Sequence, residues 1–330
     1  MKLDELAKLA GVSRTTASYV VNGKAKQYRV SDKTIAKVQA LIDEHDFKPN
    51  AMAAGLRAGK TNTIGLIVPD FENASYAKIA DRLEKSCREH SYQLLITCSN
   101  DNVENEIECA KHLLQRQVDA LLVSTILSEA ESFYQQKNIN TPIIGFDRYI
   151  HSAEVENIQT DDEGDAYRLA KELVDHQAPK SILFLGAIPE LATSRQREKG
   201  FARVVENTDI QVEYLYSPEF RKDTAQRVFE QWLTNHPMPE AVFTTSLTLL
   251  QGLLNALLKL QRTIPPELMI ATFGEHELLD VLPNKIVCSV QNHAKVVESL
   301  LDLTLHKIRV KRLAKPIDVV NRQIEYHNWQ

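Results

Sequence analysis

Apolar residues recur every three or four positions in residues 3–10, 14–21 and 32–44. This spacing is typical of amphipathic helices with one buried face. Gly11 follows the first segment, where a tight turn can use a positive φ. A serine precedes each of the next two segments, in the position of a helix N-cap. Two short helices around a glycine turn, followed by a third helix, predict a helix-turn-helix.

The pattern changes after residue 61, where short runs rich in β-branched residues alternate with helical segments such as 76–90 and 103–117. Alternation of this kind predicts parallel sheets wrapped by helices. Two successive series of runs predict two lobes. The predicted strands are 63–68, 93–98, 120–125 and 142–146, then 181–186, 212–216, 241–245, 269–273 and 286–290.

Charge is distributed unevenly along the 330 residues, whose net charge is -5. Residues 1–60 hold 11 Lys and Arg against 6 Asp and Glu, so the remaining residues are strongly acidic. A basic head on an acidic body favours a polyanionic partner for the head. The alternative is a solvated surface with no partner.

Polar residues crowd the early part of the second predicted helix: Arg14, Thr15, Thr16, Ser18 and Tyr19. These side chains suit base edges and phosphates, and recognition helices read DNA with their N-terminal residues. An ordinary three-helix bundle would explain the apolar positions of this region but not its polar ones. We therefore expect DNA binding.

Polar residues also follow many of the predicted strands, where ligands bind in open α/β sheets. The residues at these strand ends, many of them polar, are Asp70, 99–101, 124–125, Asp147, Arg148, 186–187, Thr245, Ser246, Glu275 and 291–292. Such hydrogen-bonding groups are what a sugar cleft needs. Ser75 lies before a helix, where backbone N–H groups can accept a phosphate.

Several classes of function lack their signatures. Cys87, Cys98, Cys109 and Cys288 show no metal-binding or disulfide spacing, so we expect no metal and no cofactor. The sequence contains neither a dinucleotide-binding glycine motif nor a nucleophile elbow, the motifs that would indicate an enzyme. No apolar run is long enough for a membrane span and the N-terminus has no signal-peptide pattern, so we expect a cytoplasmic protein.

The segments "KLDELAKLAGVSRTTASYVVNG" and "VSDKTIAKVQALIDEHDFKPNAMAAGLRAGKT" resemble the lac repressor family of bacterial regulators. The resemblance extends over the whole chain. The loop "GKAKQYR", with "HLLQRQVDALLVST", "HPMPEAVFTTSLTLLQG" and "IATFGEHELLD", is most similar to the branch of the family that regulates fructose metabolism.

The resemblance implies an all-α helix-turn-helix head and an α/β two-lobed body of the periplasmic-binding-protein type with parallel sheets. The implied domains are a DNA-binding domain at 1–48, a hinge helix or linker at 49–60, and an effector-binding and dimerisation domain at 61–330. The family's tetramers use an added C-terminal leucine-heptad helix. The segment "VVNRQIEYHNWQ" has none, which favours a homodimer over a tetramer.

The family also implies contacts with double-stranded operator DNA. Arg14, Thr15 and Thr16 would read bases, and the loop cations would hold phosphates. Leu56 would wedge into the minor groove if 49–60 is a hinge helix rather than a passive linker. The full implied set is Leu3, Arg14, Thr15, Thr16, Ser18, Tyr19, Asn22, Lys24, Lys26, Arg29, Ala53 and Leu56.

For the effector, the resemblance implies D-fructose 1-phosphate, with fructose 1,6-bisphosphate as the alternative. Asp147 would accept sugar hydroxyls, and Arg197 with Arg148 or Ser75 would hold the phosphate. Each arginine could instead form a structural salt bridge. Many relatives carry Asn and Asp where this chain has Thr245 and Ser246. The implied effector contacts are Ser75, Asp147, Arg148, Arg197, Ser246, Glu275 and Gln291.

The function expected from all of this is a sequence-specific regulator, mainly a repressor, of fructose or sugar metabolism genes, released from its operator by a sugar phosphate. The nearest alternative is a repressor of another sugar operon, such as a sucrose-type repressor. A sugar-converting enzyme and a plain sugar-binding protein are the other classes. The basic head argues against the last of these.

Overall fold

The chain divides by its internal contacts into residues 1–61 and residues 62–330. The computed structural model describes residues 1–48, 60–128, 131, 133–136, 139–310 and 319–329. Apart from Lys60, the predicted hinge at 49–60 lies outside the described residues, and so do the predicted DNA contacts of Ala53 and Leu56.

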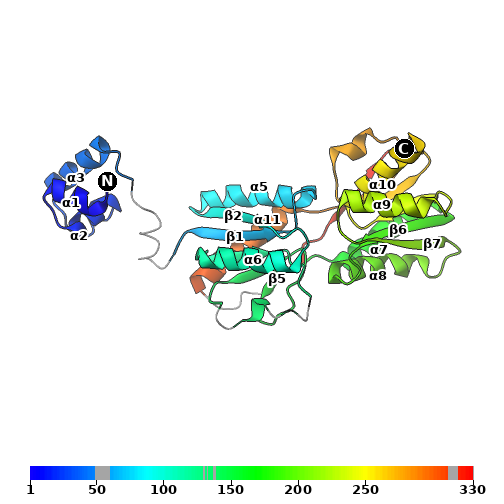
Figure 1. Ribbon diagram of the computed structural model, residues 1–330, viewed down its shortest axis with the longest axis horizontal. Coiled ribbons are helices and arrows are strands. Elements are labelled where there is room, and N and C mark those ends of the chain that lie inside the picture. Colours follow the sequence, from blue (N-terminus) through cyan, green and yellow to red (C-terminus); the bar gives the residue numbers. More distant parts are fainter. Residues whose placement is uncertain (49–59, 129–130, 132, 137–138, 311–318, 330) are drawn as a thin grey trace. The chain divides into compact units, whose positions relative to one another are not determined.

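Three helices make up the described part of the first unit: α1 Leu3–Ala10, α2 Arg14–Val21 and α3 Asp32–Glu44 (Figure 1). Their bounds are the predicted ones because local signals set them. Gly11 follows α1 with a φ of 65°, which glycine adopts without steric cost. The Ser13 and Ser31 side chains cap α2 and α3 by accepting backbone N–H groups. Leu6 and Val38 are fully buried in the small core between the helices.

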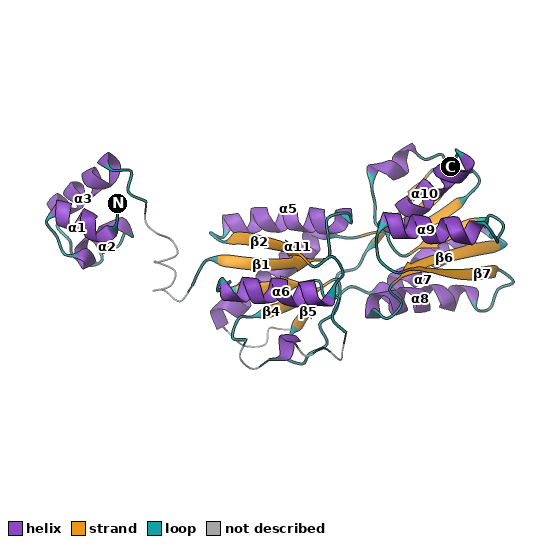
Figure 2. Cartoon of the chain, in the orientation of Figure 1, coloured by secondary structure: helices purple, strands orange, loops and turns teal. Residues whose placement is uncertain are grey.

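The second unit contains two sheets, which we call lobe 1 and lobe 2 together with the helices that cover them (Figures 1 and 2). The sheet of lobe 1 has the order β2-β1-β3-β4-β5 and is parallel throughout. Its elements are β1 Thr63–Val68, α5 Ala74–Glu89, β2 Gln93–Cys98, α6 Val103–Gln115, β3 Ala120–Val123, η1 Phe133–Gln135, β4 Ile143–Phe146 and β5 Glu156–Ile158.

The sheet of lobe 2 has the order β11-β10-β9-β8-β6-β7. Its elements are α7 Asp162–Gln177, β6 Ser181–Ala187, α8 Ala192–Val205, β7 Gln211–Ser217, α9 Lys222–Leu233, β8 Ala241–Thr244, α10 Leu247–Gln261, β9 Met269–Phe273, η2 Glu277–Val281, β10 Ile286–Val290 and β11 Gln323–His327. Helix α11, His293–Val310, packs on lobe 1 beside α5.

Each sheet is buried on both faces. In lobe 1, α5 and α11 cover one face and α6 covers the other. In lobe 2, α9 and α10 cover one face, and α7 and α8 cover the other. Burial on both faces explains why the inner strands read as continuous apolar runs rather than alternating ones.

The chain passes between the lobes three times: after β5, after β10 and just before β11. Two strands, β5 and β11, were not predicted. The prediction of parallel sheets is wrong for β11, which runs antiparallel to β10. The physical reason lies in the third passage between the lobes, just before β11. The chain leaves lobe 2 at the end of β10 and re-enters at that same edge, so the returning strand must run backwards along β10.

Gly200 in α8 allows the two helices on one face of lobe 2 to approach closely. A Cβ atom at this position would lie 2.1 Å from the carbonyl oxygen of Glu163 in α7. A backbone atom cannot move aside as the end of a flexible side chain can. The sequence therefore needs a residue without a side chain where α7 and α8 touch.

We expect Gly200→Ala to lower the free energy of unfolding by about 1–3 kcal/mol, because the added methyl forces α7 and α8 apart. Urea unfolding of the whole chain measures this change. The matched control is Lys199→Ala, which removes only an exposed ion pair and should cost at most about 1 kcal/mol. Equal stability of the two variants would contradict the close-packing role of Gly200.

Candidate functional site

The predicted base-reading residues lie at the N-terminal end of α2. Arg14 and Thr15 are exposed there, and Thr16 is half-buried with its hydroxyl 2.8 Å from that of Ser13. The Arg14 Nε atom lies 3.1 Å from a carboxylate oxygen of Asp4 in α1. This contact gives the arginine a preferred direction without burying it.

The loop that follows α2 is a defined turn rather than an open chain. Lys24, Lys26 and Arg29, the predicted phosphate contacts, are all exposed on it. Backbone bonds close the loop, among them Val30 N–H to the carbonyl of buried Ala25 at 3.0 Å. Tyr28, on the same loop, was not among the residues predicted from the sequence.

The ring of Tyr28 stacks on that of Tyr19 in α2, with ring centroids 3.8 Å apart and planes 4° from parallel. This stack fixes the loop on the second helix. Ser18 accepts hydrogen bonds from the Asn22 side chain, so Asn22 helps to end α2. Leu3 is half-buried against the core of the head.

A cavity of about 60 Å³ lies between the lobes of the second unit. Lobe 1 contributes groups from the end of β4 and the first turns of α5, and lobe 2 contributes groups from α8 and the ends of its strands. Six of the seven predicted effector residues line this cavity: Ser75, Asp147, Arg197, Ser246, Glu275 and Gln291. Lys78, His293 and Arg322 line it as well and were not predicted.

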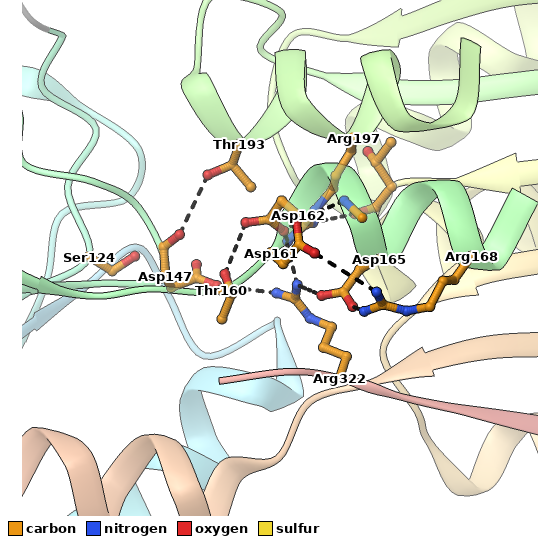
Figure 3. A network of polar contacts seen from close by, with 12 residues as sticks. Ser124, Asp147, Thr160, Asp161, Asp162, Asp165, Arg168, Thr193, Arg197 and Arg322 are labelled. Carbon is orange, nitrogen blue, oxygen red and sulfur yellow. Dashed lines mark hydrogen bonds and ion pairs between the residues drawn. The ribbon is translucent and has the colours of Figure 1, made fainter. Parts of the chain in front are cut away.

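A buried network of charges forms one wall of the cavity (Figure 3). Asp162 Oδ1 accepts from Arg197 Nε at 2.8 Å and from Arg322 Nη1 at 3.0 Å. Arg322 Nη1 also donates to Asp165 Oδ2 at 2.9 Å. Burial alone would raise the pKa of Asp162, but Arg197 and Arg322 outweigh it and hold that pKa below its usual value.

Asp147 stands beside this network at the end of β4. Its Oδ2 accepts the Tyr76 hydroxyl at 2.6 Å, and its Oδ1 lies 4.0 Å from Arg322 Nη2. Its backbone φ is 60°, a left-handed conformation that is uncommon for residues other than glycine. A carboxylate held in this way can accept hydroxyl donors from a ligand in the cavity.

Arg148 does not line this cavity. Its side chain is buried and paired with Asp101, and its guanidinium lies 5.5 Å from the centre of the Phe220 ring. It faces a second cavity of about 550 Å³, which Arg195 and Thr193 also line. The structure therefore brings Arg197 together with Ser75 and Arg322, and places Arg148 in the lining of the second cavity instead.

His293 fixes the predicted phosphate contact Ser75 through a hydrogen bond of 3.0 Å from ring nitrogen to hydroxyl. Burial, and then the nearby charge of Lys78, lower the pKa of His293 to about 4. The imidazole is therefore neutral at pH 7. The cations that line the cavity at this pH are Lys78, Arg197 and Arg322.

The described part of the chain holds no group of three or more His, Cys, Asp or Glu side chains placed to bind a metal ion. All four cysteines are free, and burial raises the pKa of Cys87 and Cys288 to about 12. In the ranges that the structure describes, no helix is both long and apolar enough to span a bilayer.

Comparison with known proteins decides the family. The model of the bacterial regulatory proteins of the lacI family matches residues 2–50, and that of a periplasmic binding protein domain matches residues 64–305. The catabolite repressor/activator of Salmonella typhimurium is 50% identical over 317 residues, 96% of this chain and 95% of that protein. This chain belongs to the lacI family of bacterial regulatory proteins.

Two further relatives of this lacI-family regulator bear on its branch. The fructose operon regulatory protein of Vibrio cholerae is 40% identical over 326 residues, 98% of this chain and 99% of that protein. A crystal structure of the Cra transcriptional dual regulator from Pseudomonas putida, in complex with fructose 1-phosphate, is 32% identical with a TM-score of 0.75. It covers 80% of this chain and 98% of that one.

The predicted family and its two-part fold are thereby confirmed. The chain is a DNA-binding transcriptional regulator and not an enzyme, as the family to which it belongs shows. Arg322 was missed because its segment has no long apolar run. The alternation in "QIEYH" was the signal of a strand there, and with it of a return of the chain to lobe 2.

We expect Arg322→Ala to lower the free energy of unfolding of this regulator by about 3–5 kcal/mol, because it leaves Asp162 and Asp165 buried without that cation. Urea unfolding measures the loss. Arg168→Ala is the matched control: Arg168 pairs with Asp165 from a half-exposed position, so its removal should cost at most about 1 kcal/mol. Similar losses in both variants would contradict a dominant role for Arg322.

Proposed function

We propose that this regulator controls genes of fructose metabolism by binding an operator through its head, and that D-fructose 1-phosphate bound between the lobes releases it. One observation carries the proposal. Three cations and the Asp147 carboxylate surround one cavity between the lobes of a chain that is 50% identical to a catabolite repressor/activator. Guanidinium and ammonium groups suit a phosphate, and a carboxylate suits sugar hydroxyls.

On the DNA side, the exposed residues fall into two groups. The N-terminal end of α2 presents Arg14 and Thr15, whose side chains can meet base edges. Lys24, Lys26 and Arg29 extend the basic surface along the loop and hold phosphates, which position the protein without reading sequence. Asn22 serves mainly to end the helix that carries the base readers.

On the effector side, Arg197 and Arg322 hold the phosphate, with the Ser75 hydroxyl as a further donor. Asp147 accepts sugar hydroxyls, and Ser246, Glu275 and Gln291 lie around the remaining wall. The Gln291 Oε1 atom is buried and has no hydrogen-bond partner among the described residues, so it is available to a ligand. Arg148 acts indirectly, by fixing the backbone beside Asp147.

The cavity of about 60 Å³ is much smaller than the roughly 300–1,000 Å³ of typical ligand pockets. Binding of a sugar phosphate therefore requires the groups around it to move. An effector that binds two arrangements of the lobes with different affinity shifts the population between them. This provides the link between the cavity and operator affinity.

The proposed domains correspond to the separate functions of DNA binding, connection and effector binding. Residues 1–48 bind DNA, 49–60 join the head to the body, and 61–330 bind effector and a second copy of the chain. We assign Ala53 and Leu56 to the minor groove, where an apolar side chain can wedge between base pairs and bend the operator. Two copies would match the two half-sites that helix-turn-helix dimers read.

Lys26→Ala should weaken binding to operator and to unrelated DNA alike, and lower the salt dependence of affinity by about 1 unit of slope. Arg14→Ala should instead lose discrimination between the operator and variants of it. Fluorescence anisotropy at several salt concentrations separates the two behaviours. If Arg14→Ala weakens every DNA equally, the division into base readers and phosphate contacts fails.

Arg197→Ala should weaken D-fructose 1-phosphate binding by at least about tenfold, the value of one charge-assisted contact. Because Arg197 is buried and paired with Asp162, Arg197→Lys provides a second variant that keeps the charge. Arg195→Ala is the control, since that arginine is exposed and lines the other cavity. Calorimetry with fructose 1-phosphate, fructose 1,6-bisphosphate and fructose measures the affinities. Equal affinity for fructose and fructose 1-phosphate would refute the phosphate site.

A further inference from the structure

One ion pair crosses between the lobes at the first cavity itself. Lys78, in the first turns of α5 in lobe 1, places its Nζ atom 2.7 Å from Oε1 of Glu275, which follows β9 in lobe 2. Both residues line the cavity. Their side chains are 40% and 35% exposed, so the pair is accessible and can part without stranding a deeply buried charge.

The other two cations of the cavity are held differently. Arg197 and Arg322 are hydrogen-bonded to Asp162, and Arg322 also to Asp165, and neither of these carboxylates lines the cavity. Asp147, which does line it, lies 4.0 Å from Arg322, beyond hydrogen-bond distance. The hydrogen-bonded partners of the two arginines can stay in place while a ligand approaches from the opposite side. The acidic partner of Lys78 is itself a wall of the cavity. Lys78 is therefore the cation whose partner an entering anion can replace.

We propose that Lys78, once an entering ligand has parted it from Glu275, contributes to the preference of this regulator for phosphorylated over free sugars. The inference rests on the proposed effector site. A ligand that enters must separate the pair, which lowers the affinity of any sugar. A phosphate regains that loss by taking the place of the Glu275 carboxylate on Lys78. A free sugar offers only neutral hydroxyls and regains little.

A second ion pair between the same lobes supplies the matched control. Arg221 Nη2 in lobe 2 lies 3.3 Å from Glu72 Oε1 in lobe 1, and neither residue lines the cavity. Separating the Arg221–Glu72 pair lowers the affinity for fructose and for fructose 1-phosphate by the same factor, because neither sugar can replace Glu72 on Arg221. Its removal therefore changes the affinities for both sugars by the same factor.

The experiment compares Lys78→Gln, Glu275→Gln and Arg221→Gln in the full chain. Calorimetry gives the affinity for fructose 1-phosphate, and displacement of fructose 1-phosphate by fructose gives the affinity for the free sugar. In Lys78→Gln we expect fructose to bind about two- to fivefold more tightly, because no pair must part. Fructose 1-phosphate should bind at least about fivefold more weakly, because its cation is lost.

Glu275→Gln should raise the affinities for fructose and for fructose 1-phosphate by about two- to fivefold each. The ratio of the two affinities should stay unchanged. The double variant Lys78→Gln/Glu275→Gln should behave like Lys78→Gln alone. Arg221→Gln should also leave the ratio unchanged. Among these variants, only those that lack Lys78 should show a lower preference for fructose 1-phosphate over fructose, a result that a purely structural cross-lobe contact would not produce.

Two results would overturn the inference. If Lys78→Gln moves both affinities in the same direction, the pair acts only on the arrangement of the lobes. If Glu275→Gln weakens both sugars, the carboxylate is a sugar ligand and not the replaceable partner of Lys78. Failure of the proposed function looks different, since the unaltered chain would then show no preference for fructose 1-phosphate over fructose.

Discussion

The contact of Asp162 with Arg197 and Arg322 is the constraint on which the arrangement of the two lobes depends. A carboxylate this deeply buried is tolerated only with cations and donors around it. Asp162 begins α7, directly after the first passage between the lobes, and Arg322 lies at the third. Lobe 2 can therefore satisfy its own buried charges only when the C-terminal segment returns to it. This return also explains the antiparallel β11.

The same network holds two cations in the lining of the cavity where we propose that the phosphate binds. Because Asp162 and Asp165 hold the two guanidinium groups from behind, both cations are fixed in place before a ligand arrives. Arg197 lies over the Phe273 ring at 4.3 Å, which further limits its movement. Preorganised cations lose little side-chain entropy on binding. Lys78 is the exception among the three, since its partner Glu275 also lines the cavity.

The fold of the head depends on local signals rather than on buried ion pairs. Its helices are short and its core is small, so local signals carry much of the specification: a left-handed glycine after α1 and serine caps on α2 and α3. The Tyr19 and Tyr28 stack then joins the cationic loop to the second helix. The residues that we propose to read bases and to hold phosphates are therefore held next to one another.

The sequence by itself determined the helices of the head, most elements of the body and the sheet edges at which the cavity residues gather. Helix bounds in the head follow from caps and glycine, and strand ends follow from apolar runs, which is why Asp147, Ser246 and Gln291 could be predicted from their places after strands. Only the tertiary structure decided which charges meet. Arg148 was predicted beside Arg197 but pairs with Asp101, while Arg322, 125 residues after Arg197 in the chain, reaches Asp162. Ion pairs between distant segments depend on how the passages between the lobes bring them together, and no local pattern records that.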